Sequence, residues 1–152
     1  MKICDHTSVG MLVWNDDKLL LIERMKFPFG FSCPAGHVDG DNSYEESAKR
    51  ELKEEVGLDA AGLELEIEGR RDNKCRREDG GWHHWKVYSV DANGEVDSSK
   101  DETKGFVWAD KDKINELGLK TEKYRNGEIS EDDWQSSPGI EPVWYDLLLI
   151  LA

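Results

Sequence analysis

Long apolar segments are missing from this chain, and their absence narrows the class of protein. The longest purely apolar run covers residues 147–152, far short of the roughly 20 residues that a bilayer-spanning helix needs. Residues 1–14 lack the basic and apolar regions of a secretory signal. We therefore expect neither a membrane-spanning segment nor a membrane partner.

Cysteine is also scarce. The chain has three cysteines, Cys4, Cys33 and Cys75, an odd number with no paired spacing. Disulfide scaffolds and zinc modules ordinarily show even sets or closely spaced pairs. The pattern thus predicts neither a disulfide framework nor a zinc site, and it favours the reducing cytoplasm as the location.

Positive charge is in short supply. Lysine and arginine number 20 against 33 acidic residues, which gives a net charge of −13 and a pI of about 4.7. Such a surface repels nucleic-acid backbones, so we expect no nucleic-acid partner. A phosphate-bearing substrate would need metal ions or a local basic patch to offset the repulsion. For most of the acidic residues, solubility is explanation enough.

The length of 152 residues predicts one domain over residues 1–152, without repeats or linkers. Apolar runs and alternation predict strands near residues 8–14, 18–23, 30–33, 63–67, 82–90 and 106–109. Capping residues predict helices over 43–56, 110–117 and 142–151. Asn93-Gly94 predicts a hairpin leading into Glu95-Val96, and the polar residues 122–139 predict a loop. Helices mixed among hairpin-like strands indicate an α/β or α+β fold with a mixed sheet.

The predicted helix over residues 43–56 carries an unusual acidic cluster. Glu51, Glu54 and Glu55 stand at i, i+3 and i+4, so they share one face. Like charges about 5 Å apart repel by roughly 3 kcal/mol at an effective dielectric near 20. A hard divalent cation would turn that repulsion into attraction. A solvated acidic face is the plainer interpretation, but a glycine-rich loop before the helix favours a metal site.

The stretch from Gly36 to Leu58 resembles the Nudix box, Gly-x5-Glu-x7-Arg-Glu-U-x-Glu-Glu-x-Gly-U, where U is aliphatic. The matching positions are Gly36, Arg50, Glu51, Leu52, Glu54, Glu55, Gly57 and Leu58. One position departs, because Asn42 stands where the family has a glutamate that braces the arginine. Asn42 can still accept a hydrogen bond from Arg50, and Asp41 is a substitute brace that brings a charge.

The resemblance implies a Nudix-like α/β/α sandwich that hydrolyses the diphosphate bond of a nucleoside diphosphate linked to another group. It implies that Glu51, Glu54 and Glu55 hold Mg²⁺ or Mn²⁺, with help from the Ala35 carbonyl. Together with Arg50 they form the expected catalytic set. The family often adds a carboxylate from a later loop as ligand or base, for which Glu102 is our candidate. Asp101 is the second choice, and a solvated loop acid is an equal alternative.

Basic residues elsewhere are candidates for contacts with substrate phosphates. Arg24 ends the second predicted strand, where the family often places such a contact, although a strand-end charge is an equal alternative. A dense basic cluster follows at Arg70, Arg71, Lys74, Arg76 and Arg77. Within it we favour Arg70 for binding substrate phosphate, because it lies at a strand end. The alternative for the rest is a solvated loop that balances nearby glutamates.

Aromatic and histidine residues are interpreted mainly as structural. Trp14, Trp108 and Trp144 lie in regular elements and are predicted to be core. Trp82, Trp85, Tyr124 and Trp134 lie nearer loops, where stacking on a nucleobase is an alternative to packing. The neighbouring His83 and His84 point to opposite faces of a strand, so they cannot form a metal pair.

Three functions compete at this stage. The leading one is an enzyme acting on a small-molecule nucleotide, such as a nucleotide sugar, ADP-ribose or a modified nucleoside triphosphate. The second is a non-catalytic nucleotide sensor, which Asn42 makes plausible and the complete set of glutamates disfavours. The third is an isomerase built on the same fold, but this sequence shows no matching context for a catalytic cysteine. A homodimer is one state that the sequence leaves open.

Overall fold

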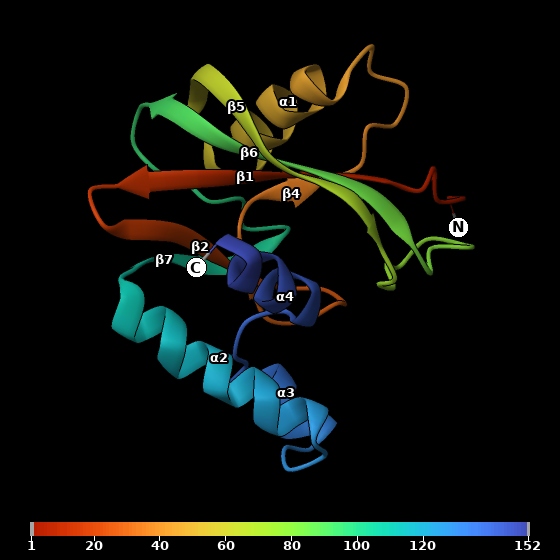
Figure 1. Cartoon of the computed structure of the whole chain (residues 1–152), viewed down its shortest axis with the longest axis vertical. Helices are drawn as coiled ribbons and strands as arrows, with labels where there is room; N and C mark the ends of the chain where they lie inside the picture. Colours follow the sequence, from red (N-terminus) through yellow and green to blue (C-terminus); the bar gives the residue numbers. More distant parts are fainter. Residues whose placement is uncertain (1, 152) are drawn as a thin grey trace.

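A mixed sheet forms the centre of the structure, a computed structural model that describes residues 2–151 (Figure 1). Its strands are β1 Thr7–Asn15, β2 Lys18–Arg24, β3 Phe31–Ser32, β4 Ala35–Gly36, β5 Asp59–Arg71, β6 His83–Asn93 and β7 Thr103–Ala109. The order along the sheet is β3-β2-β1-β6-β5, with β4 paired to β1 and β7 paired to β2. β1 and β6 run parallel, whereas the other pairs are antiparallel, so the predicted mixed sheet is confirmed.

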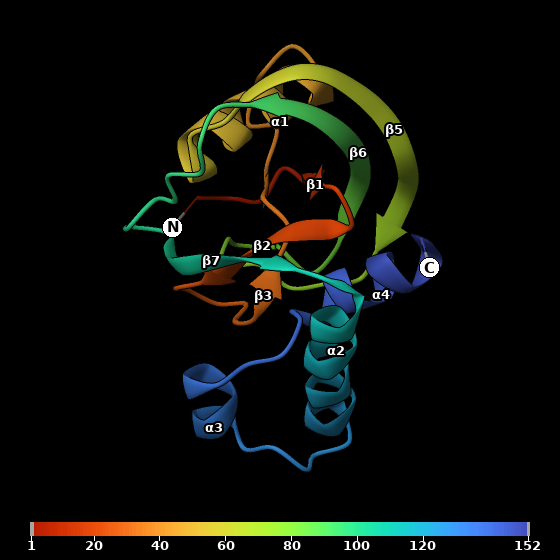
Figure 2. The same ribbon diagram turned by 90° about the vertical axis from the view of Figure 1, so that its left-hand side faces the viewer.

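Helices lie on both sides of this sheet, and those within residues 111–136 project beyond it (Figures 1 and 2). The helices are α1 Tyr44–Val56, α2 Lys111–Arg125, α3 Glu131–Ser136 and α4 Pro142–Leu151. α1 packs Leu52 and Val56 on the face that carries Met11, while α4 packs Trp144 on the opposite face, against Leu12. Successive residues of β1 thus serve separate cores, as the two-residue period of a strand requires. The predicted α/β/α layering is confirmed.

The hairpin predicted at Asn93-Gly94 is wrong. β6 ends at Asn93, and β5 rather than residues 95–96 is its antiparallel partner there, with Asp59 opposite Asn93. The chain instead returns to the end of α1, where Asp97 N–H donates to the Val56 carbonyl (2.9 Å). Carbonyls in the last turn of a helix lack partners within the helix, so this segment is used to satisfy them.

The loop predicted over residues 122–139 is also wrong, because α2 continues to Arg125 and α3 follows it. Ser130 caps α3, its Oγ accepting the Asp133 N–H (3.1 Å), and acidic residues fill the first turn. The helix buries Trp134, whose Nε1 donates to the Phe29 carbonyl (3.2 Å). A six-residue helix is held by such tertiary contacts more than by its own propensity, which explains why its polar sequence resembled a loop.

β5 departs from the simple alternation predicted for residues 63–67. Ile67 is buried as expected, but Leu65 is 46% exposed. Irregularities in the β5–β6 pairing fall between Ala60 and Gly62 and between Leu65 and Ile67. Each such irregularity shifts which side chains face the core.

The N-terminal segment lies along the loop between β5 and β6 (Figure 1). Cys4 N–H donates to the Glu78 carbonyl (2.8 Å), and Glu78 N–H donates to the Lys2 carbonyl (3.0 Å). These bonds hold residues 2–6 beside the basic loop, residues 72–82 between β5 and β6, which contains Lys74, Arg76 and Arg77. Within residues 2–151, no helix combines the length and the apolar character that crossing a membrane would require.

Candidate active site

The sequence around α1 fixes where this helix begins and ends. Ser43 Oγ accepts the Glu46 N–H (3.1 Å), and the Glu46 carboxylate accepts the Asn42 N–H (3.2 Å). At the other end Gly57 adopts φ 73° and donates its N–H to the Lys53 carbonyl (3.0 Å), as a left-handed C-terminal glycine does. The predicted caps are confirmed, and they set which residues of α1 turn towards the sheet.

The three box glutamates differ strongly in exposure. The Glu54 side chain is 59% exposed and that of Glu51 13%, whereas Glu55 is 4% exposed. Burial raises the pKa of Glu51 to about 7, against the opposing effect of Arg50. Burial also raises the pKa of Glu55 well above its ordinary value, although Arg24 opposes this. Both carboxyls therefore need protons or a nearby cation to offset their burial.

An unsatisfied atom marks the same place. Glu55 Oε1 is buried and has no hydrogen-bond partner within residues 2–151. A buried carboxylate oxygen without a partner costs free energy, so native proteins retain one mainly where another group binds. The set of oxygens on Glu51 and Glu55 suits a hard divalent cation.

Gly36 allows Glu51 to approach β4 closely. A Cβ atom at Gly36 would lie closer than 3.0 Å to the carboxyl carbon of Glu51, a separation that real side chains do not tolerate. The first glycine of the box is thus required by the position of a carboxylate on the facing helix. Ala35 precedes it and lines the same cleft as Glu51 and Glu55.

Arg50 connects the acidic face of α1 to the box loop, residues 37–43 between β4 and α1. Its Nε donates to Asp41 Oδ2 (2.9 Å), and one terminal nitrogen donates to Glu51 (2.8 Å) and Glu54 (3.3 Å). The other terminal nitrogen donates to the His37 carbonyl (3.0 Å). Asp41 therefore supplies the charged brace that Asn42 lacks, which was one of the two options open from the sequence.

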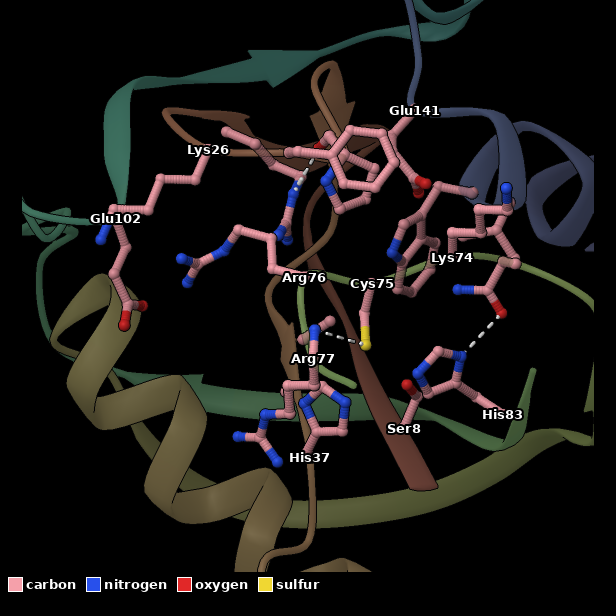
Figure 3. A pocket seen from close by; sticks show the side chains of 18 of the residues that line it. Ser8, Lys26, His37, Lys74, Cys75, Arg76, Arg77, His83, Glu102 and Glu141 are labelled. Atoms are coloured by element: carbon pink, nitrogen blue, oxygen red, sulfur yellow. Dashed lines mark hydrogen bonds between the residues drawn. The ribbon is translucent and has the colours of Figure 1, made fainter. Parts of the chain in front are cut away.

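A cleft of about 220 Å³ lies against the carboxylates of Glu51 and Glu55 (Figure 3), and Glu54 is not among the residues that line it. Its walls come from β1, β2 and the segment after it, β4 and His37, α1, the β5–β6 loop, β6, the β6–β7 loop and the start of α4. The residues that line it and bear charge are Arg24, Lys26, Glu51, Glu55, Lys74, Arg76, Arg77, Glu102 and Glu141. Acidic groups thus meet a cluster of cations in one cavity, although the chain as a whole is strongly acidic.

The predicted substrate contacts divide between this cleft and the surface. Arg24 lines the cleft and donates from Nε to the Pro28 carbonyl (2.6 Å). Glu102 lines it as well, and its charge contributes to the raised pKa of both Glu51 and Glu55. Arg70 lies outside it, since it pairs with Asp72 (3.1 Å) and covers the Trp82 ring. Lys74, Arg76 and Arg77 of the same basic cluster reach the cleft instead.

Glu141 is a cleft residue that sequence reasoning missed. It is 4% exposed and stands directly before α4. Burial raises its pKa to about 7, while Arg24 and the backbone N–H groups of Trp144 and Val143 oppose the rise. An acidic residue immediately before a proline that opens a helix was the available signal, because carboxylates favour helix N-termini.

Two of the cysteines lie together, contrary to the expectation from their spacing. Cys4, His37, Cys75 and His83 bring their sulfur and ring nitrogen atoms within 4.8 Å of one another at one side of the cleft. Burial lowers the pKa of His37 to about 4 and also lowers that of His83, so both imidazoles are neutral at pH 7. His83 and His84 do not pair with each other, as predicted, but His83 meets a different set of partners.

Several of the tryptophans are buried in the core, as the packing interpretation predicts. Trp144, Trp85 and Trp134 are buried, whereas the prediction that Trp14 is core is wrong, since it is 48% exposed near the end of β1. Trp82 stacks on His6, with ring centroids 4.1 Å apart. A protein group therefore already occupies one face of the Trp82 ring.

This chain belongs to the NUDIX domain family, whose sequence pattern matches residues 5–132. It is 42% identical over 57 residues to the ADP-ribose pyrophosphatase of Methanocaldococcus jannaschii. This match covers 35% of this chain and 34% of that protein. It is 38% identical over 58 residues to the RNA pyrophosphohydrolase of a Marinomonas species, covering 38% and 36%. The matched part is thus about a third of the length of each relative.

Solved structures show the same fold. A NUDIX hydrolase from Nitrosomonas europaea superimposes with a TM-score of 0.62 at 21% identity, over 81% of this chain and 90% of that one. The NUDIX domain of Shewanella oneidensis NrtR, solved with ADP ribose, gives a TM-score of 0.60 at 18% identity, over 84% and 88%. At these identities the likeness concerns the fold.

Proposed function

We propose that this protein is a Nudix pyrophosphohydrolase that cleaves the diphosphate bond of a nucleoside diphosphate linked to another group. The observation that carries the proposal is the buried Glu55 carboxyl, whose Oε1 has no hydrogen-bond partner within residues 2–151, beside Glu51 in a cleft that also presents cations. The names of the two curated relatives, both pyrophosphate-cleaving enzymes, support the reaction class.

The donor set fits Mg²⁺ or Mn²⁺. Glu51, Glu54 and Glu55 would hold the cation with the Ala35 carbonyl, since all four offer the oxygen ligands that hard cations prefer. When bound, such a cation polarises a diphosphate and lowers the pKa of a coordinated water. Arg50 donates to both Glu51 and Glu54, so its positive charge offsets the repulsion between these two carboxylates.

The remaining cleft residues suit the anionic substrate. Arg24, Lys74 and Arg76 place positive charge where a diphosphate would lie, and arginine offers paired N–H groups to phosphate oxygens. Glu102 is our candidate to accept the proton of the attacking water, because it lines the cleft and interacts electrostatically with Glu51 and Glu55. Arg77 is already bound to Asp39, so its role is to shape the wall.

A hydrolysis panel tests the proposal. The purified protein, with Mg²⁺ or Mn²⁺, is offered ADP-ribose, nucleotide sugars, modified nucleoside triphosphates and 5′-triphosphorylated RNA, and phosphate-bearing products are separated. We expect turnover of at least one small nucleotide and none of the RNA, since the acidic surface repels a polyanion. Tight nucleotide binding without turnover of any compound would favour a sensor. Loss of activity on adding EDTA, restored by excess Mg²⁺, is the matched control.

A further inference from the structure

Four residues to which the proposed hydrolysis assigns no role bring metal-binding atoms together. Cys4 precedes β1, His37 follows β4, Cys75 lies in the β5–β6 loop, and His83 opens β6. Their four donor atoms lie within 4.8 Å of one another, and Figure 3 shows His37, Cys75 and His83 turned towards one point. We propose that these four residues form a structural Zn²⁺ site that anchors the box loop and the basic loop.

The distances suit a four-coordinate ion. Cys4 Sγ lies 3.3 Å from His83 Nε2 and 3.6 Å from His37 Nε2. Around a tetrahedral Zn²⁺, with Zn–S near 2.3 Å and Zn–N near 2.0 Å, neighbouring ligand atoms stand on the order of 3.5 Å apart. Two thiolates with two imidazoles are a donor set that zinc favours over harder cations.

Each of the two sulfurs accepts a hydrogen bond from a backbone amide. The backbone N–H of His6 donates to Cys4 Sγ (3.3 Å), and that of Arg77 donates to Cys75 Sγ (3.4 Å). In each case the donor stands two residues after the cysteine, so two separate turns present an amide to a sulfur. Amide donors stabilise sulfur that carries negative charge, as ligand sulfur does.

A second partner also orients one imidazole. His83 Nδ1 lies 3.2 Å from Asn73 Oδ1, which accepts a hydrogen bond and so assigns the ring proton to Nδ1. The lone pair on Nε2 then faces Cys4 Sγ. A ligand histidine whose other nitrogen donates to an oxygen is the usual arrangement at zinc sites.

Gly80 closes the loop around the second sulfur. A Cβ atom there would lie closer than 3.0 Å to Cys75 Sγ, so only glycine fits. The Gly80 carbonyl accepts the Cys75 N–H (2.8 Å), and the Gly80 N–H donates to the Arg77 carbonyl (3.2 Å). The loop thus bends tightly about the thiol.

Two other interpretations account for less of this arrangement. A Cys4–Cys75 disulfide would join the sulfurs at about 2.05 Å and leave both imidazoles without a role. A neutral hydrogen-bonded cluster, in which the Cys4 S–H donates to His83 Nε2 and His37 Nε2–H donates to Cys4 Sγ, connects three of the residues but gives the Cys75 sulfur no imidazole partner among residues 2–151. A cation satisfies both nitrogens and both sulfurs at once.

The site would brace the active-site cleft from outside the chemistry. His37 directly follows Gly36 of the box, and its carbonyl accepts from Arg50. Arg77, two residues after Cys75, pairs with Asp39 of the box loop (2.7 Å). With four protein ligands no coordination position stays open, which is the mark of a structural site.

Elemental analysis of protein purified without chelator is the primary test. We expect about one zinc per chain, retained in the Glu54→Gln, Glu55→Gln double variant because the box carboxylates are not ligands. Cys75→Ser and His83→Asn should each lose the zinc, whereas Cys33→Ala, which removes a buried cysteine outside the cluster, should keep it. The double variant also separates this inference from the proposed hydrolysis, so either can fail alone.

Cobalt substitution guards against a variant that simply fails to fold. Wild-type protein stripped of metal and loaded with Co²⁺ should show strong visible absorption of a tetrahedral ion and a sulfur-to-cobalt charge-transfer band. Zinc below a tenth per chain after refolding with Zn²⁺, together with only the weak spectrum of octahedral cobalt, would overturn the proposal. So would thiol titration of the unreduced, denatured protein that finds Cys33 alone free, since that result indicates a disulfide.

Discussion

Replacing Gly36 with alanine is the sharpest perturbation of the carboxylates proposed to bind metal that leaves every carboxylate in place. The new Cβ would lie closer than 3.0 Å to the Glu51 carboxyl carbon, while ordinary contact begins at 3.4 Å. Glu51 is a flexible side chain, so it would retreat by roughly 1 Å rather than unfold the sheet, and a displacement of that size can lower turnover about 10²-fold. The cost in stability should stay near 1–3 kcal/mol, the usual range for overpacking.

Gly81→Ala is the matched control, because a Cβ there meets nothing within 4 Å and its backbone is not left-handed. Calorimetric titration with Mn²⁺ and steady-state turnover are measured for both variants, with urea unfolding to follow stability. Gly36→Ala should lose metal affinity and turnover, and Gly81→Ala should lose neither. Equal metal affinity and turnover in the two variants would refute the role given to Gly36 and to the position of Glu51.

Three further predictions concern charge. Because folding raises the pKa of Glu141 from 4.5 to about 7, the folded state holds this proton more tightly, and the stability of the metal-free protein should fall as pH rises through that window. Urea unfolding in EDTA should show Glu141→Gln flattening this fall, by about 3 kcal/mol at most; an unchanged slope would contradict the assignment. Since Asp41 already braces Arg50, Asn42→Glu should leave turnover within about twofold, whereas Asp41→Asn should lower it roughly tenfold through the loss of a charge-assisted hydrogen bond. The opposite ranking would show that the brace is misassigned. Glu55→Gln should raise the melting temperature of the metal-free protein and lower it relative to wild type in Mn²⁺, because the buried charge is costly only without a cation; destabilisation in EDTA would count against this.

The part of the site that follows local rules could be predicted from the sequence. The Ser43 and Gly57 caps place α1, and the spacing of the box glutamates then places Glu51, Glu54 and Glu55 on neighbouring positions. Arg24 and Glu102 were also expected near this site, and both line the cleft. Such features depend on residues close together along the chain or on a strongly spaced motif.

The remainder depends on contacts between distant segments. The proximity of Cys4 and Cys75 has no signal in their spacing along the sequence. It arises from the β-bridge between Ile3 and Glu78, which brings two distant segments together. Glu141 lines the cleft because α4, which it precedes, packs against the sheet. Arg70 lies outside the cleft, where its side chain contacts Asp72 and Trp82. None of these pairings is encoded in a periodic pattern.

Turnover by Glu54→Gln tests the central claim most directly. The substitution keeps the shape and helix propensity of a side chain that is 59% exposed, so folding should be unaffected while one ligand charge is lost. On the nucleotide that the panel identifies, and with Mg²⁺ or Mn²⁺ present, turnover should fall by at least on the order of 10²-fold with an unchanged melting temperature of the metal-free protein. Wild-type turnover in this variant would contradict catalysis by cations held on the carboxylates of α1.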